Sequence, residues 1–365
     1  MEENKDITIV DFRSDTLSLP TNEMRQAIYE AKVGDNIFGE DPSVNELEKK
    51  CAELFKKEAA CYVSSGTMGN LTAILIHCEK RSSEIIAGSE SHILLFEQTG
   101  VAQFGGINIR EIENKPDGTF DINVLKTKIR EDDCHMPITR LICVENTHNM
   151  LGGKVLPQKW LTSLKEFAKS VNIPLHMDGA RIFNAAVKLK IPVSEITDGI
   201  DSICFCLSKS LGAPYGSVLL GSEEFIHKAR RIVKGLGGGV RQIGFMAAAG
   251  LYSLENMVHR LKDDHDHIQK IANAIRDMKN PNFTVPKAED IHTNILFIGL
   301  NTSKIVSEDF LKKLNTISEE ETHPVIVKGL SIHVEKLRLV VCCNNSASDV
   351  DHAIRKIQQV INEFK

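Results

Sequence analysis

The sequence predicts an α/β fold, in which a mostly parallel sheet carries helices on both faces and a smaller α+β domain follows. Helical periods alternate with short apolar runs up to about residue 243, a pattern typical of parallel sheets covered by helices. Beyond that point the pattern changes to one long helical stretch, followed by a few strands and helices. A third observation agrees, because Asp178 and Lys209 each follow an apolar run that resembles a buried strand.

Hydrophobic periodicity defines the elements of the N-terminal part. Helical periods cover residues 21–33, 43–57, 67–79, 91–103, 121–131 and 157–170. Apolar runs that predict strands lie at residues 60–64, 84–87, 106–112, 140–144, 171–176 and 203–207. Breakers such as Gly152 and Gly153 separate these units.

The C-terminal part has a different organisation. One helical stretch covers residues 243–278, and it is followed by strands at 293–299 and 337–342 and by helices at 306–317 and 346–364. We therefore expect an N-terminal arm and a large domain in residues 1–255, and a small domain in residues 256–365.

Composition limits the class of partner. The 365 residues are 42% hydrophobic and 25% charged, as in an ordinary globular protein. A formal net charge of −5 without a long basic run argues against nucleic acid or an anionic membrane as the main partner. No apolar stretch approaches a membrane span, and the first residues lack the apolar core of a secretory signal. We expect a cytoplasmic protein with a small-molecule substrate.

The nine cysteines predict reduced core thiols and no metal site. Cys204 and Cys206 alternate on a predicted strand, but no second pair at ligand spacing completes a metal site. Cys342 and Cys343 are expected on opposite sides of a strand, where they cannot chelate together. The acidic and histidine residues 263–267 lie in a predicted helix, where two histidines two positions apart do not share a face.

Asp178 and Lys209 suit a pyridoxal phosphate (PLP) site. Both are expected at carboxyl ends of parallel strands, where open α/β sheets hold ligands. The pyridine nitrogen of PLP needs an anion to stay protonated, and its aldehyde needs a lysine to form a Schiff base. For either residue alone, a solvated loop side chain would be the simpler interpretation, but the pair favours the cofactor site.

Two glycine-containing segments are candidates for binding the phosphate. Residues 61–70 predict a strand that turns through Gly66 into a helix starting near Thr67, where backbone N–H groups and the Thr67 hydroxyl form a phosphate site. A plain helix cap is the alternative. The run at residues 235–242 does not fit a dinucleotide motif and instead predicts a flexible loop that carries Arg241 towards an anionic group.

In these motifs the chain resembles the low-specificity L-threonine aldolases, PLP enzymes with an aspartate-aminotransferase-like fold. The elements DGARIFNA and LSKSLGAP are specific to that family. The resemblance extends, in the same order, over residues 11–20, 34–48, 64–70, 92–100, 145–149, 176–185, 207–217, 235–244, 260–266 and 338–341. It implies a fold-type-I enzyme with a mostly parallel seven-stranded sheet, so the large domain would be the PLP-binding one. It also implies a homotetramer built from dimers.

The resemblance also assigns roles to single residues. Lys209 would form the Schiff base, Asp178 would pair with the pyridinium nitrogen and His92 would stack on the ring. Gly66 and Thr67 would hold the phosphate, together with an Arg241 contributed across a subunit interface. Arg181 would contact the cofactor, and Ser14, Arg181 and Arg338 would bind the substrate carboxylate. A guanidinium group matches a carboxylate with two parallel hydrogen bonds, which agrees with the arginine assignments.

The implied activity is that of an aldehyde-lyase, the retro-aldol cleavage of L-threonine or L-allo-threonine to glycine and acetaldehyde. A base must remove the β-hydroxyl proton, and His92, His148 or a water held by them is the candidate. Phe38 stands where the family often has tyrosine, and Cys342 departs from the polar residues that often follow Arg338. Three alternatives stay open: a β-eliminating lyase or aminotransferase on the same fold, a PLP-binding pseudoenzyme, and a cofactor-free lysine aldolase.

Overall fold

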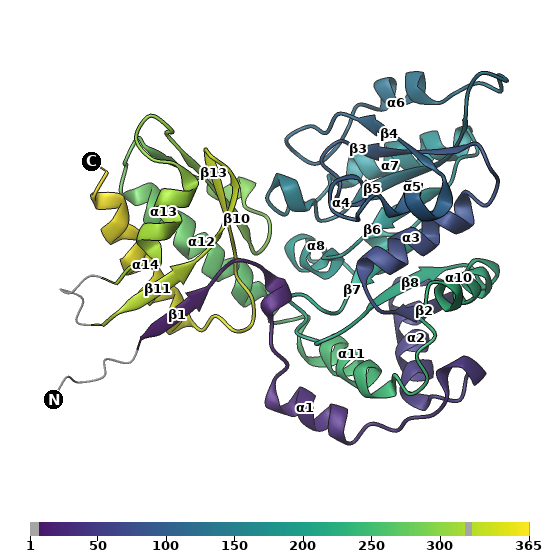
Figure 1. Ribbon diagram of the computed structural model, residues 1–365, viewed down its shortest axis with the longest axis horizontal. Coiled ribbons are helices and arrows are strands. Elements are labelled where there is room, and N and C mark those ends of the chain that lie inside the picture. The colour runs from purple at the N-terminus through teal and green to yellow at the C-terminus, as the bar shows by residue number, and fades with distance from the viewer. Residues whose placement is uncertain (1–6, 318–322, 365) are drawn as a thin grey trace. The chain divides into compact units, whose positions relative to one another are not determined.

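The structure is a computed structural model that describes residues 7–317 and 323–364 (Figure 1). The chain divides into a large unit, Pro20–Val258, and a small unit made of Met1–Leu19 and His259–Lys365. None of the helices in the described ranges has the length and apolar character needed to cross a membrane.

A seven-stranded sheet forms the centre of the large unit. Its strands, in spatial order, are β2 (Ala59–Val63), β8 (Ser217–Gly221), β7 (Ser202–Cys206), β6 (Leu175–Asp178), β5 (Ile138–Glu145), β3 (Ser83–Gly88) and β4 (Asn108–Ile112). All neighbouring pairs from β7 to β4 are parallel, whereas β8 runs antiparallel to both β2 and β7. The predicted mostly parallel seven-stranded sheet is confirmed.

Helices cover this sheet on both faces, as predicted. Because side chains alternate across a strand, Cys204 and Phe205 of β7 point to opposite faces. Cys204 packs beneath α3 and α10, in a buried cluster that also contains Ala73 and Phe225. On the other face the Phe205 ring stacks on Phe55 of α2 at a centroid distance of 5.0 Å. The helices of this unit are α1 (Asn22–Tyr29), α2 (Pro42–Phe55), α3 (Gly66–His77), α4 (His92–Leu95), α5 (Gly100–Gly105), α6 (Ile122–Lys128), α7 (Gln158–Ser170), α8 (Ile182–Leu189), α9 (Val193–Ile196), α10 (Glu223–Gly235) and α11 (Gly244–Asn256), with 3-10 helices η2 (Asn36–Phe38) and η3 (Asn149–Leu151).

Several predicted elements differ in extent, and three of them have a clear local cause. The helix expected at residues 91–103 is two short helices, α4 and α5, because Gln98 and Thr99 between them adopt left-handed φ angles of 53° and 52°. The stretch at 243–278 is likewise two helices, α11 and α12 (Leu261–Asp277). The strand expected from residue 171 begins only at Leu175, because Val171 caps the end of α7 and Asn172 has a φ of 54°.

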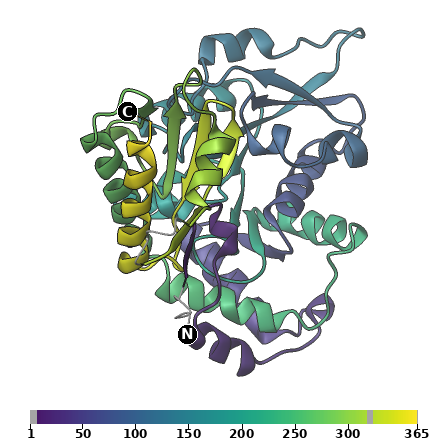
Figure 2. The ribbon, with the colours of Figure 1, turned by 60° about the vertical axis from the view of Figure 1, so that its left-hand side comes forward.

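The described residues of the small unit form two sheets and three longer helices. A four-stranded antiparallel sheet has the order β12 (Leu330–His333), β13 (Lys336–Val340), β10 (Ile295–Leu300) and β9 (Phe283–Thr284). Strand β1 (Thr8–Asp11) pairs in parallel with β11 (Val325–Lys328), so the N-terminal strand belongs to the same unit as the C-terminal residues. The helices are α12 (Leu261–Asp277), α13 (Ser307–Leu314) and α14 (Ala347–Asn362), with η1 (Asp15–Leu17) and η4 (Ala288–Asp290). Figure 2 shows α12 and α14 lying along the same side of this unit.

One expectation about the small unit is wrong. Strand β13 ends at Val340, so Cys342 and Cys343 lie beyond it and do not alternate across a sheet. Both thiols instead lie near Asn344 Oδ1, at 3.9 Å for Cys342 Sγ and 3.5 Å for Cys343 Sγ. A loop, unlike a strand, does not force adjacent side chains apart.

Candidate active site

Asp178 is the last residue of β6 and lies almost completely buried at the carboxyl end of that strand. Its Oδ1 accepts a hydrogen bond of 3.0 Å from the Ala180 backbone N–H, and its Oδ2 accepts one of 2.9 Å from Asn70 Nδ2. Two N–H donors compensate for the burial of the carboxyl oxygens. The site therefore contains a carboxyl group held in place at the sheet edge.

Lys209 lies three residues beyond β7, the parallel neighbour of β6. Asp178 pairs with Cys204 across the two strands. Asp178 and Lys209, which follows the end of β7, therefore belong to the same edge of the sheet. The structure thus places the lysine and the carboxylate at carboxyl ends of adjacent parallel strands, as the sequence predicted.

The start of helix α3 lies against β7. The Ser65 hydroxyl accepts from Met68 N at 3.2 Å, while the amides of Gly66 and Thr67 have no acceptor within the helix. A Cβ at Gly66 would lie 2.9 Å from Cys206 Sγ, so only glycine lets the chain approach the strand this closely. The result is a helix N-terminus whose first two amides lack an acceptor among the described residues, and this arrangement is chemically suited to a phosphate.

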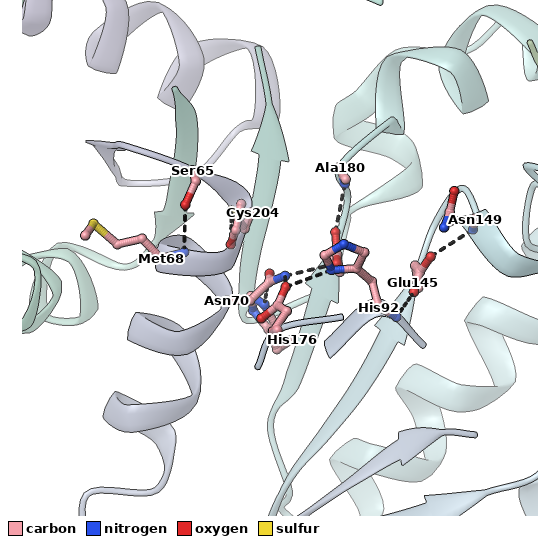
Figure 3. Close-up of polar contacts among 12 residues, drawn as sticks. Ser65, Met68, Asn70, His92, Glu145, Asn149, His176, Ala180 and Cys204 are labelled. Atoms are coloured by element: carbon pink, nitrogen blue, oxygen red, sulfur yellow. Dashed lines mark hydrogen bonds and ion pairs between the residues drawn. The ribbon is translucent and has the colours of Figure 1, made fainter. Parts of the chain in front are cut away.

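His92, the first residue of α4, is held by two glutamates, of which Glu145 is labelled beside it in Figure 3. Its backbone N–H donates to Glu145 Oε2 at 2.6 Å, and its Nδ1–H donates to Glu97 Oε1 at 3.0 Å. Burial would lower the pKa of His92, but the hydrogen bond to Glu97 and the charges of Asp178, Glu97 and Glu145 outweigh it and raise that pKa. The imidazole therefore keeps its proton to a higher pH than a free histidine does.

Glu97 and Asp178 are linked by Asn70. The Nδ2 group of Asn70 donates to Glu97 Oε1 and to Asp178 Oδ2, each at 2.9 Å. Burial and the nearby charge of Asp178 raise the pKa of Glu97, although the bonds from His92 and Asn70 act in the opposite direction. The second oxygen of Glu97, Oε2, is buried without a hydrogen-bond partner among the described residues.

His148, the other candidate base, is buried in the segment that follows β5. Within the described part of the chain, neither of its ring nitrogens has a hydrogen-bond partner. Glu145 connects this segment to His92, because its Oε1 accepts from Asn149 N at 2.8 Å while its Oε2 holds the His92 backbone. An unpaired buried imidazole is available to a substrate or a water.

The predicted arginine sites of the large unit lie in different surroundings. Arg181 is buried at the start of α8, three residues after Asp178. Arg241 is exposed and pairs with Asp35 at 3.0 Å, with its guanidinium 5.8 Å from the Phe38 ring centroid. Within this chain, Arg241 is therefore paired with the carboxylate of Asp35, the residue that caps η2.

The small unit brings Ser14 and Arg338 close in its own fold. Ser14 caps η1, and its Oγ accepts from Thr16 N at 3.2 Å. Arg338 in β13 is buried, and its Nη2 donates to the carbonyl of Arg13, the residue before Ser14, at 3.4 Å. These two predicted substrate-binding residues therefore belong to neighbouring segments.

Sequence reasoning missed Asn70, Glu97, Glu145 and His176. All four occur within or next to motifs singled out above, but nothing in their spacing indicates that they touch. The ligand-type atoms of His92, Glu97 and Asp178 lie within 4.8 Å of one another, as do those of Asp133, Cys134 and His135 on the surface. The expected absence of a metal stays a prediction.

The sheet and the site at its carboxyl edge define the class as the fold-type-I enzymes. Solved structures with this fold include a threonine aldolase from Leishmania major, with a TM-score of 0.79 at 17% identity, covering 96% of this chain and 99% of that one. A sphingosine-1-phosphate lyase from Burkholderia pseudomallei matches with a TM-score of 0.70 at 15% identity, covering 96% and 85%. At such identities the likeness concerns the fold.

Sequence similarity identifies the family. The family model for beta-eliminating lyases matches residues 11–300, and the chain belongs to this family. A low specificity L-threonine aldolase from Escherichia coli (strain K12) is 41% identical over 90% of this chain and 96% of the relative. Low-specificity L-threonine aldolase 1 from Arabidopsis thaliana is 39% identical over 96% of each chain. The predicted relationship to the L-threonine aldolases is confirmed.

Proposed function

We propose that the protein is a PLP-dependent aldehyde-lyase that cleaves L-threonine and L-allo-threonine to glycine and acetaldehyde. The observation that carries the proposal is that the buried Asp178 and the half-buried Lys209 lie at the carboxyl ends of the adjacent strands β6 and β7. The names of the relatives at 39% and 41% identity agree with this chemistry.

The residues at the sheet edge fit PLP. Asp178 offers a buried carboxylate to the pyridine nitrogen, Lys209 offers a primary amine to the aldehyde, and the amides of Gly66 and Thr67 offer donors to the phosphate. When bound, PLP supplies the electron sink for the pair released as the Cα–Cβ bond breaks. We assign ring stacking to His92, and a further cofactor contact to Arg181.

The remaining roles concern the substrate. We assign its carboxylate to Ser14, Arg181 and Arg338, because guanidinium groups bind carboxylates with paired hydrogen bonds. A neutral imidazole of His92 or His148, or a water held by one of them, takes the β-hydroxyl proton. The oxygen then becomes the carbonyl of acetaldehyde, and a proton returned to Cα completes glycine.

The active form is proposed to be a cytoplasmic homotetramer built from dimers, in which Arg241 binds the phosphate of a neighbouring subunit. The exposure of Arg241 and Phe38 on this chain is compatible with such a contact. Light scattering after size-exclusion chromatography tests the tetramer, and Arg241→Ala tests the phosphate contact through PLP affinity. Cell fractionation tests the location.

The test of the reaction is product analysis. Purified protein is incubated with PLP and either L-threonine or L-allo-threonine, and acetaldehyde and glycine are quantified. Equal amounts of the two products, lost in Lys209→Ala, are expected, and the two rates give the stereochemical preference. Product formation that survives in Lys209→Ala, or that needs no PLP, contradicts the proposal.

A second candidate is β-elimination, which the description of the matching family favours. Loss of water from threonine by this route yields 2-oxobutanoate and ammonia in place of glycine and acetaldehyde. The same incubation separates the two reactions, and absence of any product indicates a PLP-binding protein without turnover.

A further inference from the structure

A continuous and largely buried hydrogen-bond chain leads from His77 in helix α3 to Asp178. His77 Nε2 and His176 Nδ1 lie 2.8 and 2.9 Å from the Ser202 hydroxyl. His176 Nε2 lies 3.0 Å from Asn70 Oδ1, and Asn70 Nδ2 contacts both Asp178 and Glu97. In Figure 3, Asn70 and His176 lie next to each other, and His92 lies between them and Glu145.

The carboxylates at one end of this hydrogen-bond chain determine which group donates and which accepts at each step. The carboxylates of Asp178 and Glu97 only accept, so Asn70 must present its two N–H donors to them and its Oδ1 to His176. His176 must then carry its proton on Nε2, which leaves Nδ1 to accept from the Ser202 hydroxyl. The Ser202 oxygen in turn accepts from His77 Nε2–H.

Burial supports the same protonation states. His176 is completely buried, and this burial lowers its pKa to about 3. Burial also lowers the pKa of His77 to about 4. Both imidazoles are therefore neutral at physiological pH, and each has one donor nitrogen and one acceptor nitrogen.

We propose that Asn70 is a positioning residue for the cofactor-binding carboxylate Asp178 and for Glu97, and that Ser202 and His176 hold its amide in the donating orientation. If His176 carried its proton on Nδ1, Asn70 would turn its NH₂ group towards it and present an oxygen to two carboxylates, which repels them. The inference rests on the proposed use of PLP.

The position of Asn70 on α3 strengthens the argument. Asn70 follows Thr67 by three positions, so the two side chains lie on the same face of the helix. One rigid helix therefore carries both the phosphate donors at its first turn and the donor to Asp178 one turn later. The anion for the pyridine nitrogen is thus fixed relative to the phosphate site by a single element.

The first test measures the PLP dissociation constant of the full-length protein from the visible absorption of the bound cofactor, without substrate. Asn70→Leu is expected to bind PLP at least about tenfold more weakly, since a hydrogen bond to a charged group is lost. Ser253→Ala is the control, because Ser253 is as buried as Asn70 and its hydroxyl donates to Ala249 O within α11, outside the hydrogen-bond chain. Circular dichroism confirms that each variant folds.

The pH dependence of PLP affinity in Asn70→Asp distinguishes a positioning role of Asn70 from a merely structural one. Its carboxyl has the shape of the amide, but when ionised it faces Asp178 and Glu97 as a third anion. When protonated, it donates again to one of them. PLP affinity of this variant is therefore expected to improve as the pH falls from 8 to 5, relative to wild type.

Other titrating groups near Asn70 bear on this profile. Asp178, Glu97 and His176 contact it directly. His92 lies one bond further along the network, and Glu145 and His77 lie two bonds further. Two thiols pack nearby, Cys143 and Cys204, and burial raises the pKa of both, so they stay uncharged. The other groups, including Lys209 near Cys204, are common to the wild type and the variant, so their contribution cancels in the comparison.

The orientation of Asn70 is tested at His176. His176→Gln keeps an N–H donor and is expected to bind PLP within about threefold of wild type, whereas His176→Leu is expected to match Asn70→Leu. The proposal is overturned if Asn70→Leu binds PLP like wild type, if Asn70→Asp shows a flat pH profile, or if both His176 variants behave alike. A wild-type protein that binds no PLP contradicts the proposed function instead.

Discussion

His92 Nδ1 lies 3.0 Å from Glu97 Oε1, and this carboxylate is itself buried and fixed by Asn70. A histidine next to a buried anion holds its proton more tightly, which is why the pKa of His92 is raised despite its burial. Glu97 therefore controls the pH range in which His92 is neutral and able to take a proton.

Replacing Glu97 by glutamine tests whether His92 is the base. The base must be neutral, so the rate is expected to fall as the pH drops through the raised pKa of His92. Glu97→Gln keeps the shape but removes the charge, so the pKa of His92 decreases and the acid limb of kcat/KM moves to lower pH. Glu166→Gln on the exposed face of α7 is the control. An acid limb that does not move indicates His148 as the base.

A substitution in α3 tests the close packing of this helix on β7. A Cβ at Gly69 would lie 2.3 Å from Cys204 Sγ, a distance that requires the helix or the strand to shift. Gly69→Ala is therefore expected to lower the free energy of unfolding by about 1–3 kcal/mol. Urea unfolding gives this value.

The same clash predicts a rescue. Cys204→Ala removes the sulfur atom, so the double variant with Gly69→Ala is expected to recover part of the loss. Gly235→Ala in α10 is the matched control, because a Cβ there meets nothing within 4 Å and alanine favours the helix. Equal losses in both glycine variants, or no rescue in the double variant, would exclude the packing explanation.

The sequence was sufficient for what depends on local pattern. Asp178 and Lys209 follow apolar runs, so their place at the sheet edge was predictable. The role of Asn70 was not, because its partners His176 and Asp178 lie 106 and 108 positions away and the contact exists only in the folded chain. Strand β8 was missed for a related reason. It lies between β2 and β7 and is antiparallel to both, and this pairing exists only in the folded chain.

Strand β2 lies at the edge of the sheet, and the Glu48 carboxylate accepts a hydrogen bond from one of its backbone N–H groups. The Glu48 carboxylate accepts from Tyr62 N at 2.8 Å and from Arg230 Nη1 and Nη2 at 3.2 and 2.5 Å. Glu48→Ala leaves a buried N–H of β2 and a guanidinium without this acceptor, so we expect a loss of about 2 kcal/mol in the free energy of unfolding.

Two further variants in α2 serve as comparisons for the loss of stability expected in Glu48→Ala. Glu48→Gln still accepts from Tyr62 N, so it is expected to lose less stability than Glu48→Ala. Glu46→Ala changes an exposed residue of α2 and is expected to stay within about 0.5 kcal/mol of wild type. A Glu48→Ala protein as stable as Glu46→Ala would show that water satisfies the strand edge.

The buried histidines also predict how stability depends on pH. The pKa of His77 is lowered to about 4 and that of His176 to about 3, whereas an unfolded histidine titrates near 6.5. Below pH 6.5 the unfolded state binds protons that the folded state does not, so stability decreases as the pH falls and is fully present above that value. Each histidine contributes a slope of up to about 1.4 kcal/mol per pH unit.

Urea unfolding tests this dependence in His77→Gln. Between pH 7 and 5, the free energy of unfolding of this variant is expected to change less steeply with pH than that of the wild type. Equal slopes in wild type and His77→Gln would mean that His77 takes up its proton in the folded state as well.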